Sequence, residues 1–97
     1  MTSEKYLEKA LADFIKSEGG ECRKFVSPGH IGVPDRLCFL PRGMLFLVET
    51  KSTGDKTRPS QVREHERLKA LGFKVFVVST EQELTQFKET VWTTQSY

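Results

Sequence analysis

The sequence predicts an α/β fold in which helices flank a mixed four-stranded sheet. The apolar pattern indicates the element order α-β-β-β-α-β, followed by one more short helix. Strands are expected at residues 35–40 and 44–51, and the short turn between them favours an antiparallel hairpin. A strand–helix–strand crossover follows over residues 44–79, and such a connection joins parallel strands. One antiparallel hairpin and one parallel crossover together predict a mixed sheet.

The first helix is predicted over residues 4–17, where apolar side chains recur at helical spacing: Leu7, Ala10, Leu11, Phe14 and Ile15. Ser3 is suited to cap its start, and Gly19-Gly20 ends it. A short apolar strand is expected over residues 22–27. The next stretch, residues 27–34, is rich in glycine and proline, which indicates a loop.

The central hairpin comes next in the chain. Residues 35–40 form the second predicted strand, and residues 41–43 (Pro-Arg-Gly) form the turn. The third strand, residues 44–51, is almost continuously apolar until Glu49. A polar, basic loop over residues 52–59 follows, so the third strand ends where charged residues begin.

A second helix is predicted over residues 60–71, with Val62, Leu68 and Leu71 as its apolar positions. The strand after it, residues 73–79, is apolar on both faces. Such a pattern predicts a buried central strand rather than a binding surface.

The last helix is predicted from residue 81 to about residue 87. Thr80 and Glu83 have the spacing of a capping box at its start. Residues 90–97 show no clear periodicity, so no element is predicted there.

Length and composition suit a single domain spanning residues 1–97. No apolar run approaches the roughly 20 residues that cross a bilayer, and the polar stretch 1–9 does not look like a secretory signal. We therefore expect a cytoplasmic protein, in a bacterial cell or in the host cell of a phage or virus, that meets no membrane. Cys22 and Cys38 are best explained as small core hydrophobes in a reducing cytosol, although a disulfide or metal role stays open.

The net charge of +2 is unevenly distributed. Residues 23–74 contain eleven Lys or Arg and five Asp or Glu, a local net charge of +6. This excess favours a polyanionic partner such as a nucleic acid, and solubility alone is the competing explanation.

Three ionisable residues occupy positions that a purely structural role explains poorly. Asp35 opens a strand directly after Pro34, and Glu49 and Lys51 end the next strand. Because strand side chains alternate, Glu49 and Lys51 share one face and Thr50 points to the other. In a hairpin, the start of one strand lies beside the end of the next. We therefore expect Asp35 to lie close to the Glu49–Lys51 end.

Two neighbouring carboxylates repel one another unless a cation or a shared proton lies between them. Carboxylate oxygens at a partly open site suit Mg²⁺, with Mn²⁺ as a substitute, and such an ion activates water and neutralises charge on a phosphodiester. Lys51 would orient or help deprotonate the attacking water. The pattern therefore indicates phosphodiester hydrolysis. In the alternative interpretation, Glu49 and Lys51 are a solvated strand end and Asp35 is a turn residue.

Several short motifs occur in a familiar order. They are Leu7-Glu8-Lys9, Gly19-Gly20, Lys24-Phe25-Val26-Ser27-Pro28-Gly29, Gly32-Val33-Pro34-Asp35-Arg36-Leu37, Val48-Glu49-Thr50-Lys51, Pro59-Ser60-Gln61 and Leu71-Gly72-Phe73-Lys74-Val75. Together they resemble the virus-type replication-repair nuclease (VRR-NUC) family of the PD-(D/E)XK nuclease superfamily. The resemblance covers roughly residues 4–80 and implies the restriction-endonuclease-like core of that superfamily.

The resemblance also assigns residues to the site. It implies a metal-linked glutamate on the first helix, for which Glu8 is our choice and Glu4 the rival. It places Gln61 with Asp35, Glu49 and Lys51 as a catalytic residue, although Gln61 could equally be a helix cap. Thr50 stands where an apolar residue is expected. It is counted with the metal-binding residues, although alternation points its side chain away from the metal.

Standalone members of the resembled family are small and resolve branched DNA. The resemblance therefore implies an Mg²⁺-dependent, structure-selective DNA endonuclease that acts on four-way (Holliday) junctions as a homodimer, in DNA repair or recombination, without an organic cofactor. Lys56, Arg58 and Arg63 are candidate DNA contacts. His30 is either a DNA or catalytic contact or a solvent-facing loop residue. A non-catalytic DNA-binding module and a scaffolding subunit are the competing function classes.

Overall fold

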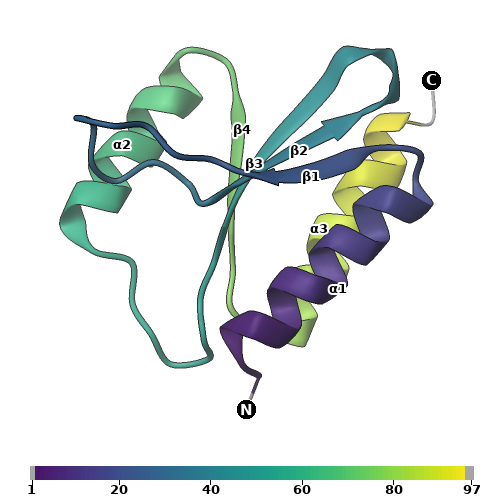
Figure 1. Ribbon diagram of the computed structural model, residues 1–97, viewed down its shortest axis with the longest axis horizontal. Helices are drawn as coiled ribbons and strands as arrows, with labels where there is room; N and C mark the ends of the chain where they lie inside the picture. The colour runs from purple at the N-terminus through teal and green to yellow at the C-terminus, as the bar shows by residue number, and fades with distance from the viewer. Residues whose placement is uncertain (1, 96–97) are drawn as a thin grey trace.

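The computed structural model describes residues 2–95, which form one four-stranded sheet covered by helices on both faces (Figure 1). The elements in chain order are α1 (Glu4–Ser17), β1 (Glu21–Lys24), β2 (Arg36–Leu40), η1 (Pro41–Gly43), β3 (Met44–Thr50), α2 (Pro59–Ala70), β4 (Lys74–Val78) and α3 (Glu81–Gln95). The strand order is β1-β2-β3-β4, with β1–β2 and β2–β3 antiparallel and β3–β4 parallel. The predicted mixed sheet is therefore confirmed.

The β2–β3 hairpin positions the candidate site. Its register pairs Arg36 with Val48 at one end and Leu40 with Met44 at the other. The turn at the closed end is a short 3₁₀ segment, in which Arg42 adopts a positive φ of 64°. Asp35, which immediately precedes β2, therefore lies at the open end of the hairpin, where β3 finishes.

The hydrophobic core lies between the sheet and the α1/α3 layer, the two helices that run side by side in Figure 1. Helix α1 contributes Leu7, Leu11 and Ile15, each fully buried, which matches the predicted apolar stripe. Its start is capped as expected, because the Ser3 hydroxyl accepts a hydrogen bond of 3.1 Å from the backbone N–H of Tyr6. Burying each large aliphatic side chain contributes about 1.5–3 kcal/mol.

Strand β4 lies at the edge of the sheet, so the prediction of a central strand is wrong. The apolar residues on both sides of β4 are explained by helices, which cover each face of the strand. Val78 belongs to the core under α1 and α3, and Phe76 packs against that core. Helix α2 packs against the same strand. An edge strand between two helical layers reads like a central one in sequence.

Helix α3 runs to Gln95, eight residues beyond the predicted end at 87. Leu84, Phe87 and Val91 recur at helical spacing and are buried, so the core holds the extra turns. The sequence of these turns is rich in threonine, which weakens the helical signal. The cap at the start is confirmed, since the Thr80 hydroxyl accepts a hydrogen bond from the Glu83 N–H at 3.0 Å.

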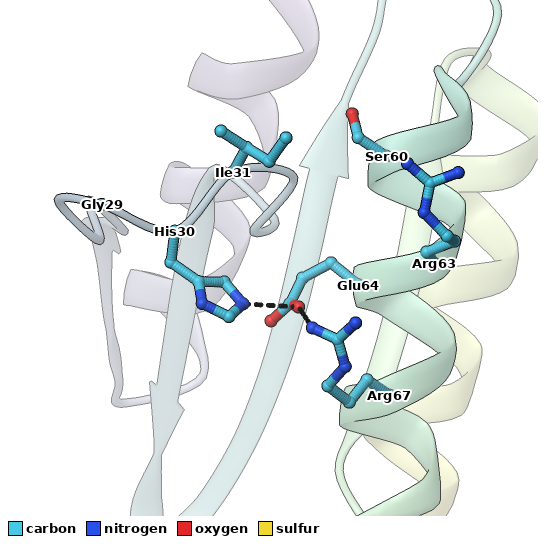
Figure 2. Close-up of a pocket in the computed structure, with 7 residues that line it drawn as sticks. All are labelled: Gly29, His30, Ile31, Ser60, Arg63, Glu64 and Arg67. Carbon is cyan, nitrogen blue, oxygen red and sulfur yellow. Dashed lines mark hydrogen bonds and ion pairs between the residues drawn. The ribbon is translucent and has the colours of Figure 1, made fainter.

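Helix α2 faces the sheet with polar residues, contrary to the predicted apolar stripe. Val62 and Leu71 are 48% and 70% exposed, whereas the buried residues are Gln61, Glu64 and His65. The loop before β2 covers this polar side. Figure 2 shows Glu64 reaching toward that loop, where its carboxylate is hydrogen-bonded to His30 Nε2 at 2.7 Å. The buried surface of α2 is thus a polar contact.

None of the helices between residues 2 and 95 has the length and apolar character that crossing a bilayer requires. Cys22 and Cys38 are free thiols that lie opposite each other on β1 and β2. Cys38 is fully buried and belongs to the hydrophobic core, and Cys22 packs against that core.

Candidate active site

Asp35 is held at the open end of the hairpin by Thr50. The Thr50 hydroxyl donates to Asp35 Oδ2 at 2.9 Å, and the Thr50 backbone N–H donates to Asp35 Oδ1 at 3.2 Å. Strand alternation alone suggested that Thr50 points away from the site, and this contact corrects that expectation. Asp35 precedes the regular part of β2, so its side chain is free to turn toward the Thr50 side of β3.

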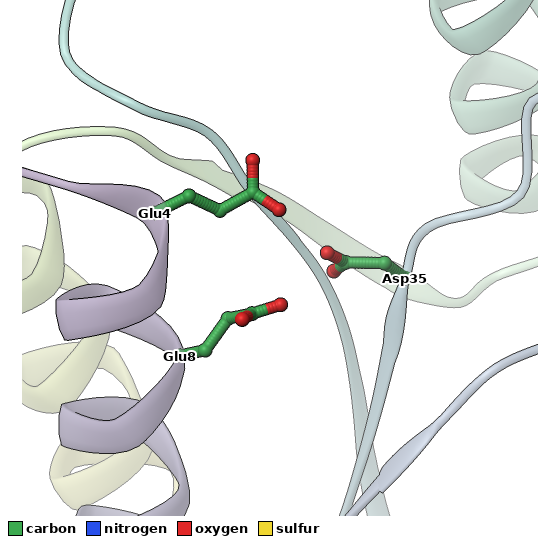
Figure 3. Close-up of side chains that lie close together, drawn as sticks. All are labelled: Glu4, Glu8 and Asp35. Carbon is green, nitrogen blue, oxygen red and sulfur yellow. The ribbon is translucent and has the colours of Figure 1, made fainter.

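Two glutamates of α1 complete an acidic cluster with Asp35. Carboxylate oxygens of Glu4, Glu8 and Asp35 all lie within 4.8 Å of one another, and Figure 3 shows the three side chains converging from α1 and the start of β2. Residues four apart on a helix share one face, so both rivals proposed from sequence reach the same place. Glu8 also accepts a hydrogen bond of 2.8 Å from Arg36 Nη2.

The electrostatics of the cluster favour a cation. Burial raises the pKa of Asp35 above its ordinary value, and the hydrogen bonds from Thr50 oppose this effect. The pKa of Glu4 is also raised, first by burial and then by the charges of Glu8 and Asp35. Carboxylates that repel one another at this distance are stabilised when a positive ion lies between them.

Glu49 lies on the other face of β3, where it contacts α2. Gln61 Nε2 donates to Glu49 Oε2 at 3.2 Å, and Lys51 Nζ lies 3.7 Å from the same oxygen. The Gln61 side-chain oxygen accepts a hydrogen bond of 2.8 Å from the backbone N–H of Arg58. Gln61 is therefore both a helix cap and a contact of the candidate site, so its two sequence-based interpretations are compatible.

The Glu49 carboxylate is unusually placed for a charged group. It is 6% exposed, and its second oxygen, Oε1, is buried without a hydrogen-bond partner among residues 2–95. Burial and, next, the charge of Asp35 raise the pKa of Glu49 to about 7. An unpaired buried carboxylate oxygen is costly unless a ligand satisfies it.

The donor set fits a hard divalent cation. Its members are the clustered carboxylates of Glu4, Glu8 and Asp35, which offer the oxygen ligands that Mg²⁺ and Mn²⁺ prefer. Glu49 lies outside this group of three, although the charge of Asp35 contributes to its raised pKa, and a cation bound at its unpartnered oxygen would offset the desolvation cost there.

The predicted DNA-contact residues lie between the end of β3 and the first turns of α2. Lys56 is in the loop between β3 and α2, Arg58 immediately precedes α2, and Arg63 is on its first turns; all three are exposed. Sequence reasoning missed Arg36 and Glu64. Arg36 directly follows Asp35, and Glu64 is one helical turn after Gln61. Their closeness in sequence to assigned residues could have indicated that they lie near the site.

The raised pKa of Glu49 predicts that this residue destabilises the metal-free fold at high pH. The folded-state pKa of about 7 exceeds the ordinary value of 4.5, so stability is full below about pH 4.5 and falls as the pH rises through 7. Replacing Glu49 with glutamine should therefore raise the free energy of unfolding by ~2–3 kcal/mol at pH 8, and far less at pH 4.5. Urea denaturation in a chelator at both pH values measures this difference.

The exposed Glu66, replaced by glutamine, is the matched control and should change little at either pH. An equal effect of Glu49→Gln at pH 4.5 and pH 8 would contradict the assigned cause.

Comparisons with known proteins agree with this geometry. No protein-family model matches the sequence. The chain is 49% identical over 75 residues to a candidate nuclease, p44, of Acyrthosiphon pisum secondary endosymbiont phage 1, a match that spans 77% of this chain and 81% of that protein. A solved structure described as a VRR_NUC domain aligns over 100% of both chains, with a TM-score of 0.84 and 35% identity.

Proposed function

The chain belongs to the VRR-NUC family of nucleases, and from this premise we propose that residues 1–97 form one Mg²⁺-dependent endonuclease domain that hydrolyses DNA phosphodiester bonds. The observation that carries the proposal is the buried Glu49 oxygen Oε1, which has no hydrogen-bond partner among residues 2–95, close to Asp35 of the acidic cluster with Glu4 and Glu8. Plain DNA binding has no use for several carboxylates at a phosphate-binding surface, because they repel the ligand. A cation-dependent cleavage site does require them.

Asp35 and Glu49 would hold the cation, with Glu8 or Glu4 contributing from α1. Thr50, also assigned to the metal site from sequence, would act by keeping the Asp35 carboxylate in place through its hydroxyl and N–H. When bound, Mg²⁺ supplies positive charge that neutralises a phosphodiester and acidifies water.

The remaining residues position the reacting groups. Lys51 would orient the attacking water and stabilise negative charge that develops on the phosphate oxygens. In the reaction, the water loses a proton as its oxygen bonds to phosphorus, and the leaving oxygen takes up a proton as its bond to phosphorus breaks. Gln61 would keep Glu49 oriented through the hydrogen bond between them. Lys56, Arg58 and Arg63 would contact the DNA backbone near the site.

The proposed activity is tested by incubating the protein with labelled four-way, flap, single-stranded and duplex DNA, each with Mg²⁺ and with a chelator. Mg²⁺-dependent cutting of at least one substrate is expected, with the four-way junction cut fastest. A protein that binds DNA but cuts none of these substrates would be a binding module, and the proposal would be wrong. The activity belongs in the cytoplasm of a bacterial or virus-infected cell, where such DNA occurs.

We further propose that the protein is a homodimer that cuts two symmetry-related strands of a junction. A four-way junction is close to two-fold symmetric, so two copies of one site match it. The exposed Trp92, whose ring centroid lies 5.6 Å from that of Phe14 in an edge-on contact, is a candidate interface residue; Tyr97, the other aromatic residue of the C-terminal tail, lies outside the described residues. Light scattering should give twice the monomer mass, and cut sites should map in pairs. A monomer that nicks one strand would contradict this.

A further inference from the structure

A cavity of about 270 Å³ lies between the loop before β2 and helix α2, outside the carboxylate site. The loop contributes His30, and α2 contributes Ser60, Arg63, Glu64 and Arg67 (Figure 2). The only acidic side chain among the residues lining this cavity is Glu64, so basic groups outnumber acidic ones around it.

Glu64 holds two of the residues that line the cavity, and donors remain for a ligand. Its side chain is 7% exposed, and its Oε1 is bonded to His30 Nε2 at 2.7 Å and to Arg67 Nη1 at 2.8 Å. A guanidinium has five N–H donors, so Arg67 keeps donors for a ligand. Among residues 2–95, Arg63 has no ion-pair partner within 4.0 Å. The cavity presents more positive charge than its single carboxylate neutralises.

The cavity is linked to the proposed catalytic centre by α2, because residues one turn apart on this helix contact each of them. Gln61 contacts Glu49 from this helix, and Glu64 follows three residues later, about 4.5 Å along the axis. The loop is packed tightly here, because a Cβ on Gly32 would lie 2.4 Å from the Ser60 carbonyl oxygen. This close approach positions the loop that carries His30. Asp35 directly follows that loop. The cavity and the proposed catalytic residues therefore share the same loop and the same helix.

We infer that this cavity binds a backbone phosphate of the DNA strand being cut, close to the scissile bond, through Arg63, Arg67 and the Ser60 hydroxyl. The inference rests on the proposed function and adds a defined subsite to it. The chemistry is that of a phosphate diester, since planar guanidinium groups donate paired hydrogen bonds to its oxygens. The His30–Glu64–Arg67 contacts orient the guanidinium of Arg67.

Charge removal at the cavity tests this inference. Arg63→Gln and Arg67→Gln are compared with Lys69→Gln, which removes the same charge from the same helix at an exposed position outside the cavity. DNA binding is measured by fluorescence anisotropy with Ca²⁺ over a range of salt concentrations. Each arginine variant should weaken binding about tenfold and reduce the salt slope by about one, and Lys69→Gln should leave both near wild type. Equal effects of all three variants would overturn the inference.

A second measurement locates the phosphate. Single neutral methylphosphonates are placed at each position within about three nucleotides of the mapped cut site. At one position, the substitution should weaken binding by wild type about tenfold and by Arg63→Gln hardly at all, because the contact is already lost. If every position affects both proteins equally, the cavity binds no phosphate, although cleavage by wild type still supports the nuclease. If wild type neither binds nor cuts DNA, both proposals fail together.

Discussion

Cleavage is expected to fall by at least ~10³-fold when Asp35, Glu49 or Lys51 is replaced by alanine. Asp35 and Glu49 are proposed cation ligands, so losing either leaves the site unable to bind the ion that activates water. Lys51 lies 3.7 Å from Glu49 and is the proposed stabiliser of charge on the phosphate. Single-turnover cleavage of a four-way junction with Mg²⁺ measures the loss. Circular dichroism and thermal unfolding check that each variant is folded.

The exposed ion pair of Glu66 and Lys69 supplies matched controls on α2. Alanine at either position removes one charge of the same type as in the site variants and should leave cleavage within a few-fold of wild type. If any of the three site variants, correctly folded, cut DNA at nearly the wild-type rate, its assignment to the site would be wrong.

Removal of divalent cations should abolish cutting, and Mg²⁺ or Mn²⁺ should restore it. Both ions accept oxygen ligands in octahedral geometry, which suits the carboxylates around Asp35 and the free oxygen of Glu49. Ca²⁺ is larger and less demanding in geometry, so it should support DNA binding without cleavage. Binding by anisotropy and cleavage by gel, measured on the same junction, separate the two effects.

The cation should also reverse the destabilisation caused by Glu49. Mg²⁺ should raise the melting temperature of wild type, with a smaller effect on Glu49→Gln, because an ion that binds only the folded state stabilises it. Efficient cleavage in a chelator, or with Ca²⁺ as the sole divalent ion, would contradict a metal-activated reaction.

Local sequence patterns were sufficient for the parts of the fold that depend on neighbours in the chain. Helix α1 has the bounds predicted from its apolar spacing, 4–17, because one face of it supplies the core. The hairpin followed from the short turn at 41–43. Its pairing brought Asp35 to the end of β3, where Thr50 binds it. Each of these predictions rests on contacts that are close in sequence.

The sequence by itself thus determined the mixed sheet, the hairpin and the proximity of Asp35 to the end of β3. Only the tertiary structure decided which distant segments pack against each face of the helices. The burial of Glu64 on α2 depends on the loop packed across it, and the extension of α3 to Gln95 depends on the core beneath Val91. Likewise, Glu4 and Glu8 reach Asp35 only because α1 packs beside the hairpin. Periodicity shows which residues share a face, whereas packing between distant elements determines what that face meets.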